Sequence, residues 1–116
     1  MAVTWNGVLP AITTKFNSDY SVDYGFFAEH CTWLVDAGCV GIVPTGSLGE
    51  GATLTAEEKA KLVATAVKAV GDRASIVPGI AALSTAEAVR MAQAAAAEGA
   101  HGLMVLPPYV YSTDWR

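Results

Sequence analysis

The chain has 116 residues, of which 53% are hydrophobic and 16% charged, and its formal net charge is −4. This length predicts at most one domain of modest size. No run of lysine or arginine supplies the basic surface on which nucleic-acid binding depends, so we expect no nucleic-acid partner. The composition favours a small molecule, or another copy of a similar chain, as the partner.

The two cysteines, Cys31 and Cys39, belong to no C-x-x-C motif and to no Cys/His cluster. We therefore expect no disulfide framework and no metal site, and we interpret both residues as small buried hydrophobes. The N-terminal sequence lacks the basic and apolar regions of a signal peptide, and no apolar run reaches the ~20 residues of a membrane span. These patterns predict a cytoplasmic protein without a membrane partner.

Four apolar runs have the length and flanking residues of buried strands. They are residues 7–14, the run that begins at Gly41, residues 74–82 and residues 101–107. The runs are continuous in Val, Ile and Leu, which is typical of parallel strands covered on both faces. They begin roughly thirty residues apart, which is the size of one βαβ step. The sequence between them predicts three helices, over residues 23–37, 56–70 and 85–98. The expected N-caps are Asp23, Thr55 and Ser84, the last two within capping boxes T-A-E-E and S-T-A-E, and glycines at positions 38, 71 and 99 end the helices.

The turn after the second strand, residues 45–51, contains three glycines within six residues, at Gly46, Gly49 and Gly51. Glycine permits positive φ and close backbone approach, which leaves N–H groups free to bind an anion at the approach to a helix. The same pattern also fits a tight strand-to-helix turn that binds nothing. From the residues alone, both interpretations stay open.

The ends of the strands distinguish two parallel α/β architectures. Hydroxyl and glycine residues gather where the strands finish, which is where a (β/α)8 TIM barrel places its chemistry. A dinucleotide-binding fold would need G-x-G-x-x-G after the first strand, whereas this chain has T-T-K-F-N there. We therefore predict a TIM barrel in which residues 1–116 supply about the first four β/α units, the N-terminal half of a single domain.

With these motifs in place, the chain resembles the first half of the dihydrodipicolinate synthase and N-acetylneuraminate lyase superfamily of pyruvate-dependent lyases. The G-[ST]-[TS]-G-E turn of that family matches residues 46–50, and its A-T-L-T-x-E-E-K segment matches residues 52–59. Its P-x-Y motif matches residues 107–109. The opening G-V-x-x-A-I-T-x-F and the V-D-A-G-x-x-G-I segment also fit, so the resemblance covers nearly the whole chain.

The resemblance implies class I chemistry, in which a lysine on the sixth strand forms a Schiff base with a 2-oxo acid such as pyruvate. A tyrosine on the fifth strand moves protons, and the turn holds the substrate carboxylate. On this basis we expect Thr45, Gly46, Ser47 and Leu48 to bind substrate and Ser47 and Tyr109 to take part in catalysis. We expect no cofactor. The expected partners are a homo-oligomer, such as a tetramer built from dimers, or a completing C-terminal half.

Two residues depart from the family pattern. Leu48 replaces the second hydroxyl residue of the turn, and Val110 stands where the synthases carry a second tyrosine that relays protons across a subunit interface. These departures favour cleavage or dehydration of another 2-oxo acid over dihydrodipicolinate synthesis. Tyr111 is one substitute for the missing tyrosine, although adjacent residues point in different directions.

The chain contains no lysine in the family's Schiff-base position. Lys15 is near a strand end but lies in a polar stretch, so we interpret it as a solvated loop residue. The sequence fits a truncated enzyme, one half of a split protein, or a half barrel that pairs with its own copy. The alternative to an enzyme is a catalytically incomplete half barrel that acts as a binding or assembly module.

Overall fold

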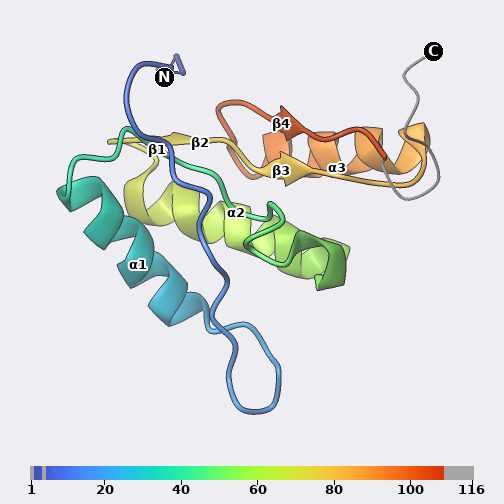
Figure 1. Cartoon of the computed structure of the whole chain (residues 1–116), viewed down its shortest axis with the longest axis horizontal. Helices are drawn as coiled ribbons and strands as arrows, with labels where there is room; N and C mark the ends of the chain where they lie inside the picture. The colour runs from blue at the N-terminus through green and yellow to red at the C-terminus, as the bar shows by residue number, and fades with distance from the viewer. Residues whose placement is uncertain (1, 4, 109–116) are drawn as a thin grey trace.

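The computed structural model describes residues 2, 3 and 5–108 (Figure 1). Its helices are α1 (Tyr24–Asp36), η1 (Gly51–Thr53, a 3-10 turn), α2 (Ala56–Val70) and α3 (Thr85–Ala97). Its strands are β1 (Gly41–Ile42), β2 (Ser75–Ile76), β3 (Gly79–Ile80) and β4 (Met104–Val105). Strand runs and helices alternate along the chain, as the sequence predicts, with β2 and β3 both in the run at residues 74–82.

The strands run parallel and lie side by side in chain order. Gly41 of β1 pairs with Ser75 of β2, and Gly79 of β3 pairs with Met104 of β4. The predicted first strand forms one parallel bridge, Ala11 with Val43, on the other side of β1. The four segments therefore neighbour one another in the order expected of consecutive barrel strands.

The regular strands are much shorter than the four apolar runs. The run at residues 74–82 contains two strands of two residues each, separated by Val77 and Pro78. Pro44 and Pro78 lie in neighbouring runs, and proline has no N–H to donate, so the ladder of backbone bonds is interrupted there. Single bonds carry the pairing past each gap, such as Gly79 N–H to the Pro44 carbonyl at 2.8 Å.

The helix caps are confirmed with one difference. Asp23 accepts the Phe26 N–H at 3.0 Å, and Thr55 and Glu58 form a complete capping box. Ser84 accepts the Glu87 N–H, but within the described part of the chain the Glu87 carboxylate returns no bond. The second predicted capping box is thus only half formed.

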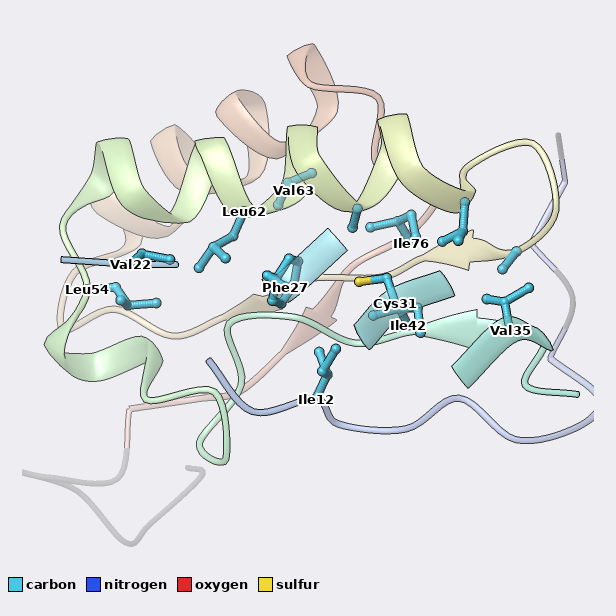
Figure 2. Close-up of a cluster of buried hydrophobic side chains, with 13 residues drawn as sticks. Ile12, Val22, Phe27, Cys31, Val35, Ile42, Leu54, Leu62, Val63 and Ile76 are labelled. Atoms are coloured by element: carbon cyan, nitrogen blue, oxygen red, sulfur yellow. The ribbon is translucent and has the colours of Figure 1, made fainter. Parts of the chain in front are cut away.

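The core lies between the strands and the helices α1 and α2 (Figure 2). Phe27 and Cys31 of α1 meet Leu62 and Val63 of α2 and Ile76 of β2 in one cluster. By contrast, α3 buries only Ala95. The helices α1 and α2 therefore pack against β1 and β2 through this cluster.

The prediction that the strands are covered on both faces holds only for the middle two runs. Residues 41–45 and 74–80 are all buried. In the first run, however, Ala11 and Thr13 are exposed while Ile12 and Thr14 are buried, and both residues of β4 are exposed. The first run is therefore covered on one face by this chain and open on the other, whereas no described residue of the fourth run is buried.

Candidate functional site

The turn after β1 starts at a strained threonine. Thr45 has φ of 59°, in the left-handed region that β-branched residues rarely adopt. It is 7% exposed, and its hydroxyl donates to the Gly79 carbonyl at 3.1 Å. Such a conformation persists only where the surroundings fix it, and the bond to the next strand does so here.

Backbone bonds close the turn on itself. Gly51 N–H donates to the Gly46 carbonyl and Glu50 N–H to the Ser47 carbonyl, both at 3.1 Å. Thr53 then donates to the Glu50 carbonyl through both its N–H and its hydroxyl. Glu50 therefore holds the turn through its main chain, with φ of 57°.

Two glycines are required by close backbone approach. A Cβ on Gly51 would overlap the Thr45 carbonyl oxygen, and one on Gly79 would lie 2.9 Å from that same oxygen. The backbones of the turn and of β3 thus pack directly against each other, because no side chain separates them.

Thr14 ties the first strand run to this turn. Its side chain is buried, and its hydroxyl donates to the Gly49 carbonyl at 2.7 Å. Thr14 is a hydroxyl residue at a predicted strand end, but it is absent from the predicted site residues. Its position beside Thr13 is a signal by which it could have been found.

The middle of the turn presents free backbone donors. Ser47 and Leu48 are exposed, Leu48 to 65%. In the part of the chain that the structure describes, neither the Ser47 N–H nor the Leu48 N–H donates to a protein acceptor. Paired amides of this kind can bind a carboxylate oxygen.

Beside the turn lies a pocket of about 390 Å³. Its walls come from three successive strand ends: the turn after β1, the residues after β3, and β4 with the residue that follows. They contribute Thr45, Gly46, Ser47, Gly79, Ile80, Ala81, Met104, Val105 and Leu106. The structure therefore brings three of the predicted site residues to one pocket, while Leu48 does not line it.

Lys59 is a wall residue that the sequence reasoning did not select. It lies in the first turn of α2 and lines this pocket. It also lines a groove of about 310 Å³ between α2 and α3. The capping box at Thr55 places Lys59 close behind the glycine-rich turn, and that spacing is a signal by which it could have been found.

Tyr109, the other predicted catalytic residue, lies outside the described residues, as do Val110 and Tyr111. Among the described residues, no three His, Cys, Asp or Glu side chains gather as a metal site would require. None of the helices described is long and apolar enough to span a membrane.

A sequence profile of the Dihydrodipicolinate synthetase family matches residues 4–116. The chain belongs to this family. The 4-hydroxy-tetrahydrodipicolinate synthase of Mycolicibacterium gilvum (strain PYR-GCK) is 49% identical over 102 residues, which are 88% of this chain and 34% of the relative. The chain thus spans about a third of the length of the curated relatives it matches.

Solved structures of the dihydrodipicolinate synthase family share the fold. Dihydrodipicolinate synthase from Aquifex aeolicus superposes with a TM-score of 0.85 at 34% identity, over 92% of this chain and 36% of the other. YagE, a prophage protein of the family from E. coli K12, was solved in complex with pyruvate. It superposes with a TM-score of 0.85 at 29% identity, over 94% of this chain and 37% of the other. These likenesses support the predicted barrel-type α/β fold for part of such a barrel. That the chain supplies four of eight units stays a prediction.

Proposed function

We propose that this chain is the N-terminal part of a lyase that acts on pyruvate or another 2-oxo acid through a lysine Schiff base. Residues 1–116 would form the N-terminal half of its single barrel domain. In this proposal the turn at residues 46–50 binds the substrate carboxylate. The observation that carries it is the pair of unpartnered amides at Ser47 and Leu48, in a turn beside a pocket. The pyruvate complex of YagE supports the substrate class.

The turn suits a carboxylate for electrostatic reasons. The N–H groups of Ser47 and Leu48 carry partial positive charge, and the Ser47 hydroxyl adds a third donor. Lys59 brings a positive charge to the same pocket and Glu50 a negative one, so the binding in this proposal depends on the directed N–H and hydroxyl donors. Thr45 contributes to the substrate site through its backbone and its position at the start of the turn, because its hydroxyl already donates to the Gly79 carbonyl.

An imine is an effective intermediate for a 2-oxo acid. A neutral lysine amine attacks the ketone carbon, one proton is taken up and water leaves. The product is a protonated imine whose nitrogen withdraws electrons. A carbanion formed at the neighbouring carbon is stabilised by that withdrawal, so a carbon–carbon bond can break or form there. In this proposal the lysine comes from the part of the barrel beyond residue 116, and Tyr109 contributes to proton transfer.

Lys15, the lysine near the end of the first strand run, does not replace that residue. Lys15 is exposed, and its Nζ lies 4.6 Å from the centre of the Phe26 ring. A Schiff-base lysine needs a buried amine, and Lys15 lies on the exposed surface of a loop. We therefore assign Lys15 to the loop surface.

We also propose that the complete enzyme is a homo-oligomer and that it is located in the cytoplasm.

A second candidate is dihydrodipicolinate synthesis itself. The curated relatives at 41–49% identity are named 4-hydroxy-tetrahydrodipicolinate synthase, which favours this reaction. Leu48 and Val110 depart from the synthase pattern, which favours cleavage or dehydration of another 2-oxo acid. An assay for 4-hydroxy-tetrahydrodipicolinate on the completed barrel separates the two. Activity with the native Leu48 would support the second candidate, whereas activity that appears only in Leu48→Thr would support the first.

Borohydride trapping tests the proposal. A chimera is made in which this chain replaces the matched stretch of the M. gilvum relative, and it is referred to below as the completed chimera. We expect pyruvate and borohydride to add one reduced pyruvate group to the completed chimera and none to residues 1–116 alone. An adduct on the isolated chain would assign the amine to Lys15 or Lys59. No adduct on the folded completed chimera would favour the non-catalytic binding or assembly module.

A further inference from the structure

The first strand run directs one hydroxyl side chain away from the core. Ile12 and Thr14 are buried, and Ile12 belongs to the cluster between the strands and the helices α1 and α2 (Figure 2). Ala11 and Thr13, which alternate with them, are exposed. Successive side chains of a strand point to opposite faces, so the Thr13 side chain lies on the face away from α1 and α2.

Thr13 is level with the start of the glycine-rich turn. The parallel bridge between Ala11 and Val43 fixes the register of the first strand run against β1. Two residues further along both segments, that register places Thr13 beside Thr45. Thr45 begins the turn and lines the candidate pocket. Thr13 is therefore at the height of the candidate site.

The backbone on both sides of Thr13 is fixed against the turn. A Cβ on Gly49 would lie 3.0 Å from the Ile12 carbonyl oxygen, and the Thr14 hydroxyl donates to the Gly49 carbonyl at 2.7 Å. Thr13 lies between these two contacts, so its position relative to the turn is set by the fold. Within the described residues its own hydroxyl has no hydrogen-bond partner, which leaves one side-chain donor available next to the turn.

In a closed barrel this donor would face the substrate. The helices surround the outside of a (β/α)8 barrel, so the strand face away from them points into the barrel. The substrate binds where the strands end and the following loops begin. Thr13 meets both conditions, because it lies on the face away from the helices and next to the last residue of its strand run.

We propose that Thr13 is a further substrate-binding residue, whose hydroxyl donates to an oxygen of the 2-oxo acid held by the turn. The inference rests on the proposed function, since it takes that acid as the substrate. The donors at Ser47 and Leu48 follow β1, whereas Thr13 belongs to the neighbouring strand run. The acid is thus bound from two adjacent strand ends, and removal of the Thr13 hydroxyl weakens its binding.

Borohydride trapping with pyruvate in the completed chimera measures this contact. Thr13→Val keeps the shape of the side chain and removes the donor, so the pyruvate concentration for half-maximal trapping should rise about fivefold. Thr13→Ser keeps the donor and should stay within about twofold of the parent. Equal values for Thr13→Val and the parent would overturn the proposal. Unchanged trapping with a lower urea midpoint would also overturn it, because the hydroxyl would then bond to a neighbouring strand.

A second measurement does not depend on the Schiff base. In the completed chimera with Thr13→Cys, a thiol reagent labels position 13, and mass spectrometry of that peptide gives the rate. Excess pyruvate should slow the labelling by about threefold or more, because the bound acid covers this position. The matched control, Ser18→Cys in the exposed loop before α1, should react equally with and without pyruvate.

The labelling result separates this inference from the proposed function. Protection of position 13 without a borohydride adduct would leave the inference standing while the Schiff-base proposal fails. Labelling of position 13 that pyruvate does not slow would overturn the inference, whether or not an adduct forms.

Discussion

The Thr14 hydroxyl donates to the Gly49 carbonyl at 2.7 Å across 35 residues of sequence. This bond joins the end of the first strand run to the glycine-rich turn, which begins after β1. On the other side of the turn, the Thr45 hydroxyl makes the matching bond to the carbonyl of Gly79, the first residue of β3. Two threonines thus hold the turn between its neighbours, and the free amides of Ser47 and Leu48 are fixed in position by them.

Thr14→Val should destabilise the chain by about 1–2 kcal/mol, because it leaves the Gly49 carbonyl without its buried partner. Equilibrium urea unfolding measures the change. The control is Thr13→Val, an exposed neighbour on the other face of the same strand run, which should change stability by less than about 0.5 kcal/mol. Equal effects of the two changes would mean that the Thr14 bond does not hold the turn.

Gly51→Ala should cost about 2–3 kcal/mol, since the added methyl group meets the Thr45 carbonyl, which packs against β3. The matched control is Gly25→Ala in the first turn of α1, where the nearest atom would be 3.6 Å away. That change should stabilise the chain by up to about 1 kcal/mol, because alanine restricts the unfolded chain. Thermal unfolding of both variants is the measurement, and a tolerated Gly51→Ala would contradict the packing described.

His101 should make stability depend on pH. The Ile76 N–H donates to His101 Nδ1 at 3.0 Å, which requires a neutral ring. Burial, with a smaller effect from the positive N-terminus, lowers the pKa of His101. The folded state therefore favours the unprotonated form. The stability that neutral His101 contributes is fully present above pH ~6.5, and it is lost as the pH falls through the lowered pKa of the folded state.

Urea midpoints between pH 5 and 8 check this expectation. His101→Asn retains an acceptor near the Ile76 N–H without a titrating ring, so its midpoint should fall less than that of the parent chain as pH drops from 7 to 5. Identical profiles for His101→Asn and the parent would rule out the His101 bond as the cause.

Cys31 should be unreactive in the folded chain. It is fully buried, and that burial raises the pKa of its thiol to about 12, so little thiolate forms near neutral pH. Cys39 is only half-buried. A disulfide reagent at pH 8 should therefore modify one thiol per native chain and the second only after denaturation. In Cys39→Ser no thiol should react before unfolding, and rapid modification of that variant would contradict the burial of Cys31.

Local signals in the sequence were sufficient for the helices. Thr55 and Glu58 predict a capping box because both halves depend on residues three apart, and Gly38 and Gly99 take the positive φ expected after a helix. The resemblance, carried by the turn motif and residues 52–59, gave the family. These features depend on contacts within a few residues, which the sequence contains directly.

What the sequence did not predict depends on contacts between distant segments. Nothing near Thr14 in sequence reveals Gly49, and nothing near Lys59 reveals the pocket wall it forms. The strand lengths were overestimated because the interruptions at Pro44 and Pro78 act across neighbouring strands. The open faces at Ala11 and Met104 also depend on which segments cover them, and that is a property of the assembled fold.

The most direct test of the central claim measures the pyruvate concentration that gives half-maximal borohydride trapping in the completed chimera. If the turn binds the substrate carboxylate, Ser47→Ala should raise that concentration about tenfold, the loss expected for one hydrogen bond to a charged group. Thr65→Ala removes a hydroxyl whose one bond within the described residues goes to the Lys61 carbonyl on α2, and it should leave the value unchanged. A Ser47→Ala value equal to that of Thr65→Ala would contradict the assignment of the turn to substrate binding.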